Sequence, residues 1–179
     1  MRILGVDPGL STAGIGLIET GKHPLDLRAL DWMTITTNAG LPLPERLLEL
    51  GNDLEEFLTE AKADIAVVEK LFFATNKKTA METAQARGVI ILTLKRHGIE
   101  VIDATPLQLK TAITGDGQAD KLQMQTMVKR ILNLPTLPTP ADAADALGLA
   151  IYGAHHATSA VAVSTMPSPR TAHVRRPVI

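Results

Sequence analysis

Apolar and polar positions are arranged along this chain in a pattern that predicts short strands and longer helices. Short apolar runs bounded by glycine and proline are typical of strands, and apolar residues spaced three and four apart are typical of helices. The predicted strands cover residues 3–6, 13–18, 27–37, 65–68 and 99–102. The predicted helices begin with one after Pro44 and continue with 76–97, 105–113, 119–133 and 140–156.

The order of these elements predicts an α/β fold with a five-stranded mixed sheet and helices on both faces. Residues 65–68 are apolar throughout, as in a central strand covered on both faces. We expect the first, fourth and fifth strands to be parallel. In the helix 76–97, Met81 and Leu92 fall on the predicted apolar side, and Gly88 suggests a close approach of another backbone or helix.

The composition favours one globular domain. A chain of 179 residues, 45% of them apolar and 21% charged, can bury a full core. No apolar run reaches the ~18–20 residues of a membrane helix, and the N-terminus has no secretory pattern. The absence of cysteine excludes disulfides, zinc–thiolate sites and thiol nucleophiles. We therefore expect a cytoplasmic protein that does not enter a membrane and whose metal ligands, where present, are oxygen or imidazole.

The charges are unevenly distributed, although the net charge of −1 gives no sign of a nucleic-acid partner. The segment 158–179 is rich in Ala, Ser, Thr and Pro and contains three arginines and no acid. We predict that it is a disordered basic tail following a single domain over residues 1–157. Acids outnumber bases in that domain, so nucleic-acid binding by it would require a local basic patch.

Acidic residues stand at the ends of two predicted strands and at the start of the last helix. Asp7 and Glu69 follow apolar strands, and Asp142 and Asp145 share one face of the helix. An acid at the end of a buried strand is costly unless it is paired with something. Two Mg²⁺ ions about 4 Å apart need roughly this ligand set to promote in-line attack on a phosphodiester. We expect two Mg²⁺ per site, replaceable by Mn²⁺.

Some of these acids also have a structural interpretation. Asp7 could form a turn with the Pro-Gly pair that follows it. Asp142 could form a capping box with Thr139, the expected N-cap of a helix that begins at Pro140. Asp145 is left without such an explanation, because it lies one turn deeper in the helix.

Three further residues of metal-binding type are assigned structural roles. Asp103 also follows a predicted strand, but the Thr105-Pro106 pair after it is typical of a helix start. His155 and His156 fall at the end of the last helix, where a cationic side chain suits the helix dipole. We do not interpret any of the three as a metal ligand.

Four stretches of the chain match the motifs of one family, in register over about residues 1–157. They are Arg2-Ile-Leu-Gly-Val-Asp-Pro-Gly-Leu10, Ala66-Val-Val-Glu-Lys-Leu-Phe72, Ala84-Gln-Ala-Arg-Gly-Val89 and Ala141-Asp-Ala-Ala-Asp-Ala-Leu147. On these stretches the sequence resembles the RuvC family of Holliday-junction resolvases. The resemblance implies an RNase H-like fold, a homodimer and symmetric nicking of four-way junction DNA. It also implies work beside the RuvA–RuvB branch-migration machinery.

The resemblance also implies roles for individual residues. Metal-ligand roles fall on Asp7, Glu69, Asp142 and Asp145; some relatives carry His where this chain has Asp145. Two basic residues of the family fall on Lys110 and Lys121, and its stacking aromatic falls on Phe72. Independently of the family, Phe72 and Phe73 are adjacent in a predicted strand-to-helix connection, where one of them could stack on the bases of an opened junction. The predicted DNA contacts are Lys70, Phe72, Phe73, Lys77, Lys78, Arg87, Lys110 and Lys121.

Three other functions share part of this pattern. An actin-like or sugar-kinase-like phosphate-binding domain opens with a similar strand and glycine hairpin, but it needs a second such half. A YqgF-like nuclease would act on RNA. A junction-binding protein that does not cut would need basic residues, and the set of acids argues against it because phosphate repels carboxylates.

Overall fold

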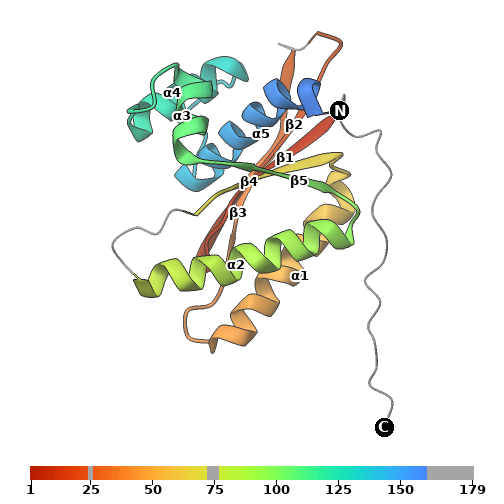
Figure 1. Cartoon of the computed structure of the whole chain (residues 1–179), viewed down its shortest axis with the longest axis vertical. Helices are drawn as coiled ribbons and strands as arrows, with labels where there is room; N and C mark the ends of the chain where they lie inside the picture. The colour runs from red at the N-terminus through yellow and green to blue at the C-terminus, as the bar shows by residue number, and fades with distance from the viewer. Residues whose placement is uncertain (24–25, 72–76, 161–179) are drawn as a thin grey trace, which may run out of the picture.

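A five-stranded mixed sheet forms the centre of the protein (Figure 1). The computed structural model describes residues 1–23, 26–71 and 77–160, apart from the side chains of 77–79 and 157–160. The strands are β1 (Arg2–Asp7), β2 (Thr12–Thr20), β3 (Leu27–Thr36), β4 (Ile65–Glu69) and β5 (Glu100–Ala104), in the order β3-β2-β1-β4-β5. β1, β4 and β5 are parallel, and β2 is antiparallel to both of its neighbours. The predicted fold class and strand directions are confirmed.

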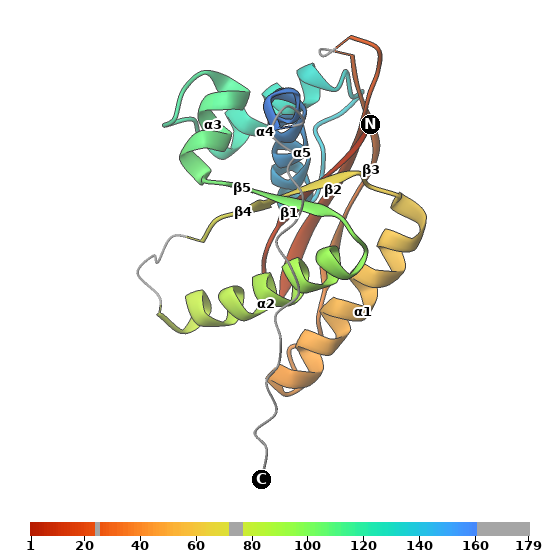
Figure 2. The same cartoon turned by 45° about the vertical axis from the view of Figure 1, so that its right-hand side comes forward.

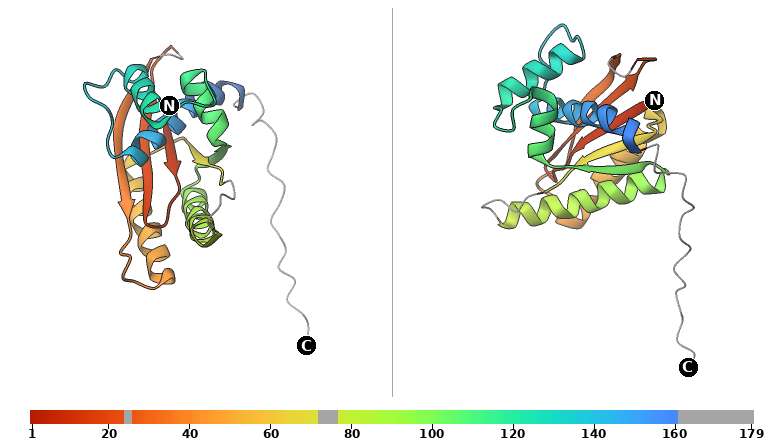
Figure 3. Two further views of the ribbon diagram at one scale, coloured as in Figure 1. Left: turned by 90° about the vertical axis from the view of Figure 1, so that its left-hand side faces the viewer. Right: turned by 45° about the horizontal axis from the view of Figure 1, so that its top comes forward.

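Helices cover both faces of the sheet, as the two turned views show (Figures 2 and 3). The helices α1 (Leu43–Ala61) and α2 (Lys77–Arg96) lie on one face, and α3 (Pro106–Thr114), α4 (Lys121–Ile131) and α5 (Ala141–Ala160) lie on the other. Successive side chains of a strand point to opposite faces of the sheet, so the core has two parts, one on each face. Leu4 and Val6 of β1 pack with α1 and α2, whereas Ile3 packs with α3, α4 and α5.

Glycines allow the backbone of α5 to lie directly on β1 and β2. A Cβ atom on Gly5 would overlap the Ala146 carbonyl oxygen, and one on Gly14 would overlap the carbonyl oxygen of Asp142. Gly16 meets the same helix, because a Cβ atom there would lie 2.5 Å from the Leu147 backbone nitrogen. The sheet therefore has a side-chain-free channel, and the first turns of α5 lie in it.

The buried side of α2 differs from the predicted one. Met81 and Leu92 are 65% and 52% exposed, so their assignment to the core was wrong. The core side instead carries Ala86, Ile90 and Leu94, which follow one another at four-residue spacing. Gly88 also departs from expectation, because a Cβ atom there would meet no described atom within 4 Å.

The two ends of α5 also differ from prediction. The helix begins at Ala141, and the carbonyl of Pro140 accepts the first helical hydrogen bond from the Ala144 N–H at 3.2 Å. Pro140 thus takes the N-cap position expected for Thr139. At the other end α5 runs to Ala160, so its last three residues fall in the segment predicted as tail, and residues 161–179 lie outside the described part.

No helix in the described part of the chain combines the length and apolar character needed to cross a lipid bilayer.

We predict that Gly14→Ala destabilises the protein, because its new methyl group would overlap the Asp142 carbonyl oxygen. The expected cost is about 2 kcal/mol, or a fall of roughly 4–8 °C in Tm by thermal unfolding. Gly88→Ala is the matched control, since open space surrounds that Cβ position and a mid-helix alanine should gain about 1 kcal/mol. An unchanged Tm for Gly14→Ala would contradict the close packing of α5 on the sheet.

Candidate active site

Asp7 and Glu69 end two neighbouring parallel strands. The residues before them, Val6 of β1 and Val68 of β4, are paired in register, so the two acids follow side by side. Asp7 projects on the same side of the sheet as Gly5, against which α5 packs. Glu69 holds the equivalent position on β4. Both carboxylates therefore point to the side that α5 covers.

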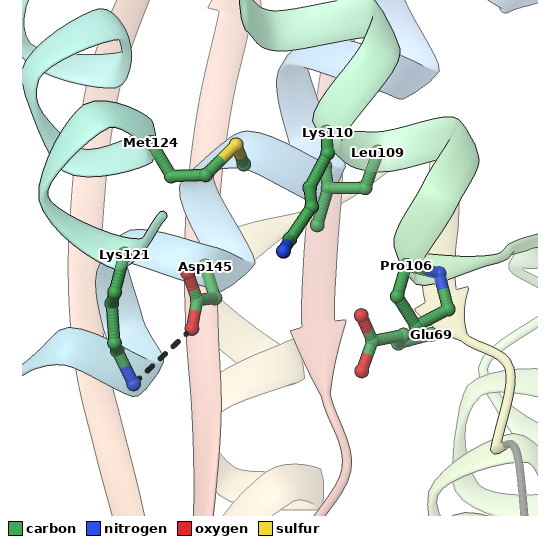
Figure 4. A pocket seen from close by; sticks show the side chains of 7 residues that line it. All are labelled: Glu69, Pro106, Leu109, Lys110, Lys121, Met124 and Asp145. Carbon is green, nitrogen blue, oxygen red and sulfur yellow. Dashed lines mark ion pairs between the residues drawn. The ribbon is translucent and has the colours of Figure 1, made fainter. Parts of the chain in front are cut away.

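The helix α5 brings two further acids to this place. Asp142 and Asp145 lie three residues apart near its N-terminal end, and so share one side of the helix. One carboxylate oxygen from each of Asp7, Asp142 and Asp145 lies within 4.8 Å of the others. We call these three residues the acid cluster. Glu69 is not part of it but lines the same pocket as Asp145 (Figure 4).

Burial and the repulsion between carboxylates raise the pKa values of Asp7, Glu69 and Asp145. Burial raises the pKa of Asp7 to about 8, and the carboxylates of Glu69, Asp145 and Asp142 add to this effect while Lys121 opposes it. The pKa of Glu69 rises to about 7, first through burial and then through Asp145. Burial also raises the pKa of Asp145, against the effect of Lys121. Without a cation the pocket therefore holds more negative charge than its surroundings favour.

The starts of α3 and α4 are fixed by capping boxes. Thr105 caps α3 and pairs reciprocally with Gln108, which confirms the helix start predicted at Thr105-Pro106. Asp120 caps α4 and pairs in the same way with Gln123. Each box satisfies backbone N–H groups that would otherwise lack partners. The first residue of α4, Lys121, consequently has a defined place beside the acids.

Two lysines reach the pocket from these helices. The Nζ atom of Lys121 lies 3.6 Å from Asp142 Oδ1 and 3.5 Å from Asp145 Oδ2. Lys110 of α3 points into the same pocket, which Pro106, Leu109 and Met124 complete with apolar side chains (Figure 4). The alternative interpretation of Asp142, a capping box with Thr139, has no support, because the Asp142 carboxylate forms an ion pair with Lys121.

Asp103 connects two residues that were predicted to contact DNA. It forms an ion pair with Arg87 of α2, and its other oxygen lies 3.6 Å from Lys70 Nζ. The Arg87 guanidinium also donates a hydrogen bond to the Glu69 carbonyl at 2.9 Å. Arg87 thus ties α2 to the end of β4, directly behind an acid of the pocket. Asp103 has the structural role expected of it.

The remaining predicted residues lie elsewhere or outside the described part. Phe72 and Phe73 fall outside it, and Lys77 and Lys78 begin α2 with side chains that are not described. His155 and His156 lie at the far end of α5 from the acids. The ring of His156 stacks on Tyr152 and its Nδ1 is 2.9 Å from that residue's carbonyl oxygen. Burial lowers the pKa of His155, with His156 adding to the effect.

Sequence reasoning missed three contacts of the site. The ion pairs of Lys121 with Asp142 and Asp145 join α4 to α5, and the hydrogen bond from Arg87 joins α2 to β4. The spacing of the partners along the sequence predicts none of them. The only sequence hint was the Asp120-to-Gln123 spacing, which marks the helix start that positions Lys121.

The donor set fits a hard divalent cation. The acid cluster offers three carboxylate oxygens within 4.8 Å, and such oxygens are the ligands that Mg²⁺ and Mn²⁺ prefer. The raised pKa values of Asp7 and Asp145 point the same way, since a cation would favour their ionised forms. The residues present therefore suit metal-assisted phosphodiester chemistry.

Comparisons with known proteins agree with this site. A family model described as crossover junction endodeoxyribonuclease RuvC matches residues 3–155. The RuvC of Chloroflexus aurantiacus is 48% identical over 157 residues, which is 88% of this chain and 94% of the relative. The RuvC of Mycobacterium ulcerans is 48% identical over 151 residues, covering 84% and 82%.

A solved structure agrees as well. Thermus thermophilus RuvC, in complex with a Holliday junction substrate, superposes with a TM-score of 0.82 at 30% identity, covering 89% of this chain and 96% of that one. The mixed sheet with helices on both faces is thus the predicted RNase H-like fold. The chain belongs to the RuvC family of crossover junction endodeoxyribonucleases.

Proposed function

We propose that the chain resolves four-way DNA junctions by paired symmetric nicks and that its acid cluster and Glu69 hold the metal ions for this reaction. The observation that carries the assignment of the site is the convergence of Asp7, Asp142 and Asp145 to within 4.8 Å, beside Glu69. Family membership supports the substrate, as does the Holliday junction bound to Thermus thermophilus RuvC.

The ligand roles follow from the donors available in the pocket. Asp7, Asp142 and Asp145 would hold one ion, and Glu69 would hold a second ion together with a member of the cluster. We propose Mg²⁺ as the ion, with Mn²⁺ able to replace it, because both prefer carboxylate oxygen. Bound ions of this kind lower the pKa of an attacking water and stabilise the charge on the leaving oxygen.

The protein's own groups would bind and orient the DNA strand. Lys110 and Lys121 line the pocket with the acids, which supports the proposal that their ammonium groups bind the phosphate next to the scissile bond. Apolar contacts from Pro106, Leu109 and Met124 limit the water around it. No side-chain nucleophile is needed, since water attacks.

The structure supports the other predicted DNA contacts to different extents. Lys70 is 51% exposed, so it can bind a phosphate while it remains near Asp103. Arg87 is 20% exposed and already bonded to the protein, which favours a supporting role over direct DNA binding. Phe72, Phe73, Lys77 and Lys78 remain predictions from the sequence, with a stacking role proposed for Phe72.

Symmetric cutting of a junction requires two active sites in fixed relation. We therefore propose a homodimer, in which each protomer supplies one pocket to one of two opposed strands. Cooperation with the RuvA–RuvB machinery is proposed from family membership alone.

We predict that Asp7→Asn abolishes cleavage and leaves junction binding intact, because the amide keeps the shape of the carboxylate but not its charge. Incubation with a mobile four-way junction and a matched linear duplex, in Mg²⁺, Mn²⁺ or EDTA, should show metal-dependent paired nicks in the junction alone for the wild type. The variant should cut at least about a thousand-fold more slowly. Its junction affinity in a gel-shift assay should stay within about two-fold.

Asp53→Asn serves as the control for this substitution, because Asp53 is an exposed acid of α1 away from the pocket. It should cut at the wild-type rate. Retained cleavage by Asp7→Asn would remove Asp7 from the site. Tight junction binding without cleavage by the wild type would favour the protein that binds but does not cut.

We also predict that the metal-free protein loses stability as pH rises from about 4 to about 8. The folded state keeps a proton on Asp7 up to about pH 8, whereas the unfolded chain loses it near its ordinary pKa of 3.8. Because the folded state then binds more protons, its stability falls with rising pH. Thermal unfolding in EDTA should show Tm falling by about 5 °C more between pH 5 and 8 in the wild type than in Asp7→Asn.

Metal should reverse this loss. Mg²⁺ binds the ionised carboxylates and should raise the wild-type Tm more at pH 8 than at pH 6, with little effect on Asp7→Asn. Parallel pH profiles for the wild type and Asp7→Asn would show that this carboxyl group has an ordinary pKa in the fold.

Deletion of residues 161–179 should leave the cleavage rate within about two-fold of the wild type, because the Ala-, Ser-, Thr- and Pro-rich sequence of this terminal segment is typical of a dispensable tail. The cut follows α5, whose Ile151, Tyr152 and Ala154 are buried and remain in place. The rate is measured on the mobile junction at saturating protein. A large loss of activity would show that the basic tail takes part in catalysis.

A further inference from the structure

Lys121 is the residue of the pocket that contacts two members of the acid cluster at once. Its Nζ atom lies 3.6 Å from Asp142 Oδ1 and 3.5 Å from Asp145 Oδ2. Among the residues that the structure describes, no other lysine or arginine forms an ion pair with either acid. Its positive charge also lowers the pKa of Asp7, against the larger effects of burial and of the neighbouring carboxylates. One ammonium group thus partly neutralises all three members of the cluster.

We propose that Lys121 is the internal counter-ion of the metal-free cluster and that metal binding displaces its ammonium group from Asp142 and Asp145. The inference rests on the proposed function, since it takes these acids as metal ligands. Lysine and metal then compete for the same carboxylates. The metal-free site is held together by a cation from α4, and the loaded site releases that cation toward the DNA.

The placement of Lys121 makes such an exchange possible. The capping box of Asp120 with Gln123 fixes the start of α4, so the Lys121 backbone is held in place whether or not its side chain is paired. The side chain itself is 54% exposed and has a flexible four-carbon stem. The ammonium group can therefore move into solvent or onto a phosphate without any change in the helix.

Charge and geometry favour the metal once it is available. A divalent ion carries twice the charge of the ammonium group and binds carboxylate oxygen at about 2.0–2.1 Å when it is Mg²⁺, well inside the contacts that Lys121 makes. An ammonium group left at 3.5–3.6 Å from the same carboxylates would stand beside the ion and be repelled by it. Displacement relieves this repulsion.

The electrostatics of Lys121 agree with this role. Burial works to lower its pKa, but the carboxylates of Asp145 and Asp142 outweigh that effect and raise it. The ammonium group is consequently fully charged at neutral pH. Metal loading does not require Lys121 to lose its proton, only to move.

Calorimetric titration of the purified full chain with Mn²⁺ alone tests the exchange. Lys121→Met removes the competing charge and keeps a flexible chain of similar length, so Mn²⁺ should bind about three- to ten-fold more tightly than to the wild type. The same variant should cut the junction more slowly, because the phosphate loses a partner. Tighter metal binding together with slower cleavage is the combined result that we expect.

Lys110→Met is the matched control. Lys110 lines the same pocket but forms no ion pair with the cluster within the described part of the chain. Its removal should tighten Mn²⁺ binding by less than about two-fold, through the longer-range loss of charge. Unchanged or weaker Mn²⁺ binding by Lys121→Met would overturn the inference. Equal tightening by the two variants would also overturn it, because the effect would then be one of net charge.

A second measurement uses the unsubstituted protein. Reductive ¹³C-methylation of lysines keeps their charge, and the Lys121 signal is identified by its loss in Lys121→Arg, which keeps a positive charge at this position. Titration with Mg²⁺ should shift this signal in the wild type and saturate with the occupancy of the metal site, whereas Lys95, exposed on α2, should not shift. A Lys121 signal unmoved by saturating Mg²⁺ would overturn the inference even if Lys121→Met failed to fold.

These experiments separate the two proposals. If wild-type Mn²⁺ binding is absent, or is unaffected by Asp7→Asn, the metal site itself is refuted. If Mn²⁺ binding depends on Asp7 but is insensitive to Lys121→Met, only the role of Lys121 as counter-ion is refuted.

Discussion

The whole site depends on how closely the backbone of α5 approaches the sheet. Gly5 and Gly14 lack the side chains that would otherwise hold the helix away. Gly14 is also the register partner of Asp7 across the β1–β2 ladder, and it touches the Asp142 carbonyl group. One glycine therefore sets the separation between a strand acid and a helix acid. Any side chain there would widen the gap that a metal ion has to bridge.

This close packing has an electrostatic cost. It gathers carboxylates in a half-buried pocket, and burial and repulsion raise the pKa of Asp7 to about 8. Such strain is typical of a site that is completed by a cation. Lys121 provides one such charge in the metal-free state, and Arg87 supports the pocket from behind through the Glu69 carbonyl. Two positively charged side chains of the protein, Lys121 and Arg87, therefore lie next to the acids of the pocket.

Local pattern was sufficient to predict most of the fold. The five strands, the helix after Pro44 and the helix start at Thr105 follow from periodicity and capping, which are properties of neighbouring residues. The strand acids were also accessible, because an acid that closes an apolar run is visible in the sequence. The buried side of α2 was not, since that helix has apolar residues on two sides and only contact with the sheet decides between them.

Contacts between elements were beyond the sequence for the same reason. Thr139 lost the capping position to Pro140, and Lys121 was identified as a DNA contact rather than as a partner of the acids. Both contacts depend on where α5 lies relative to the neighbouring elements, and the spacing of residues along the sequence does not indicate that position.

The position of α5 in the chain has a consequence for the cell that makes this protein. Two acids of the pocket lie in the last helix, whereas the strands that receive it are translated first. A nascent or partly folded chain can form its sheet before α5 has docked, but it has only half of its acids at the pocket. Nuclease activity therefore arises only after α5 has been translated and has docked, so molecules without a docked α5 cannot damage DNA.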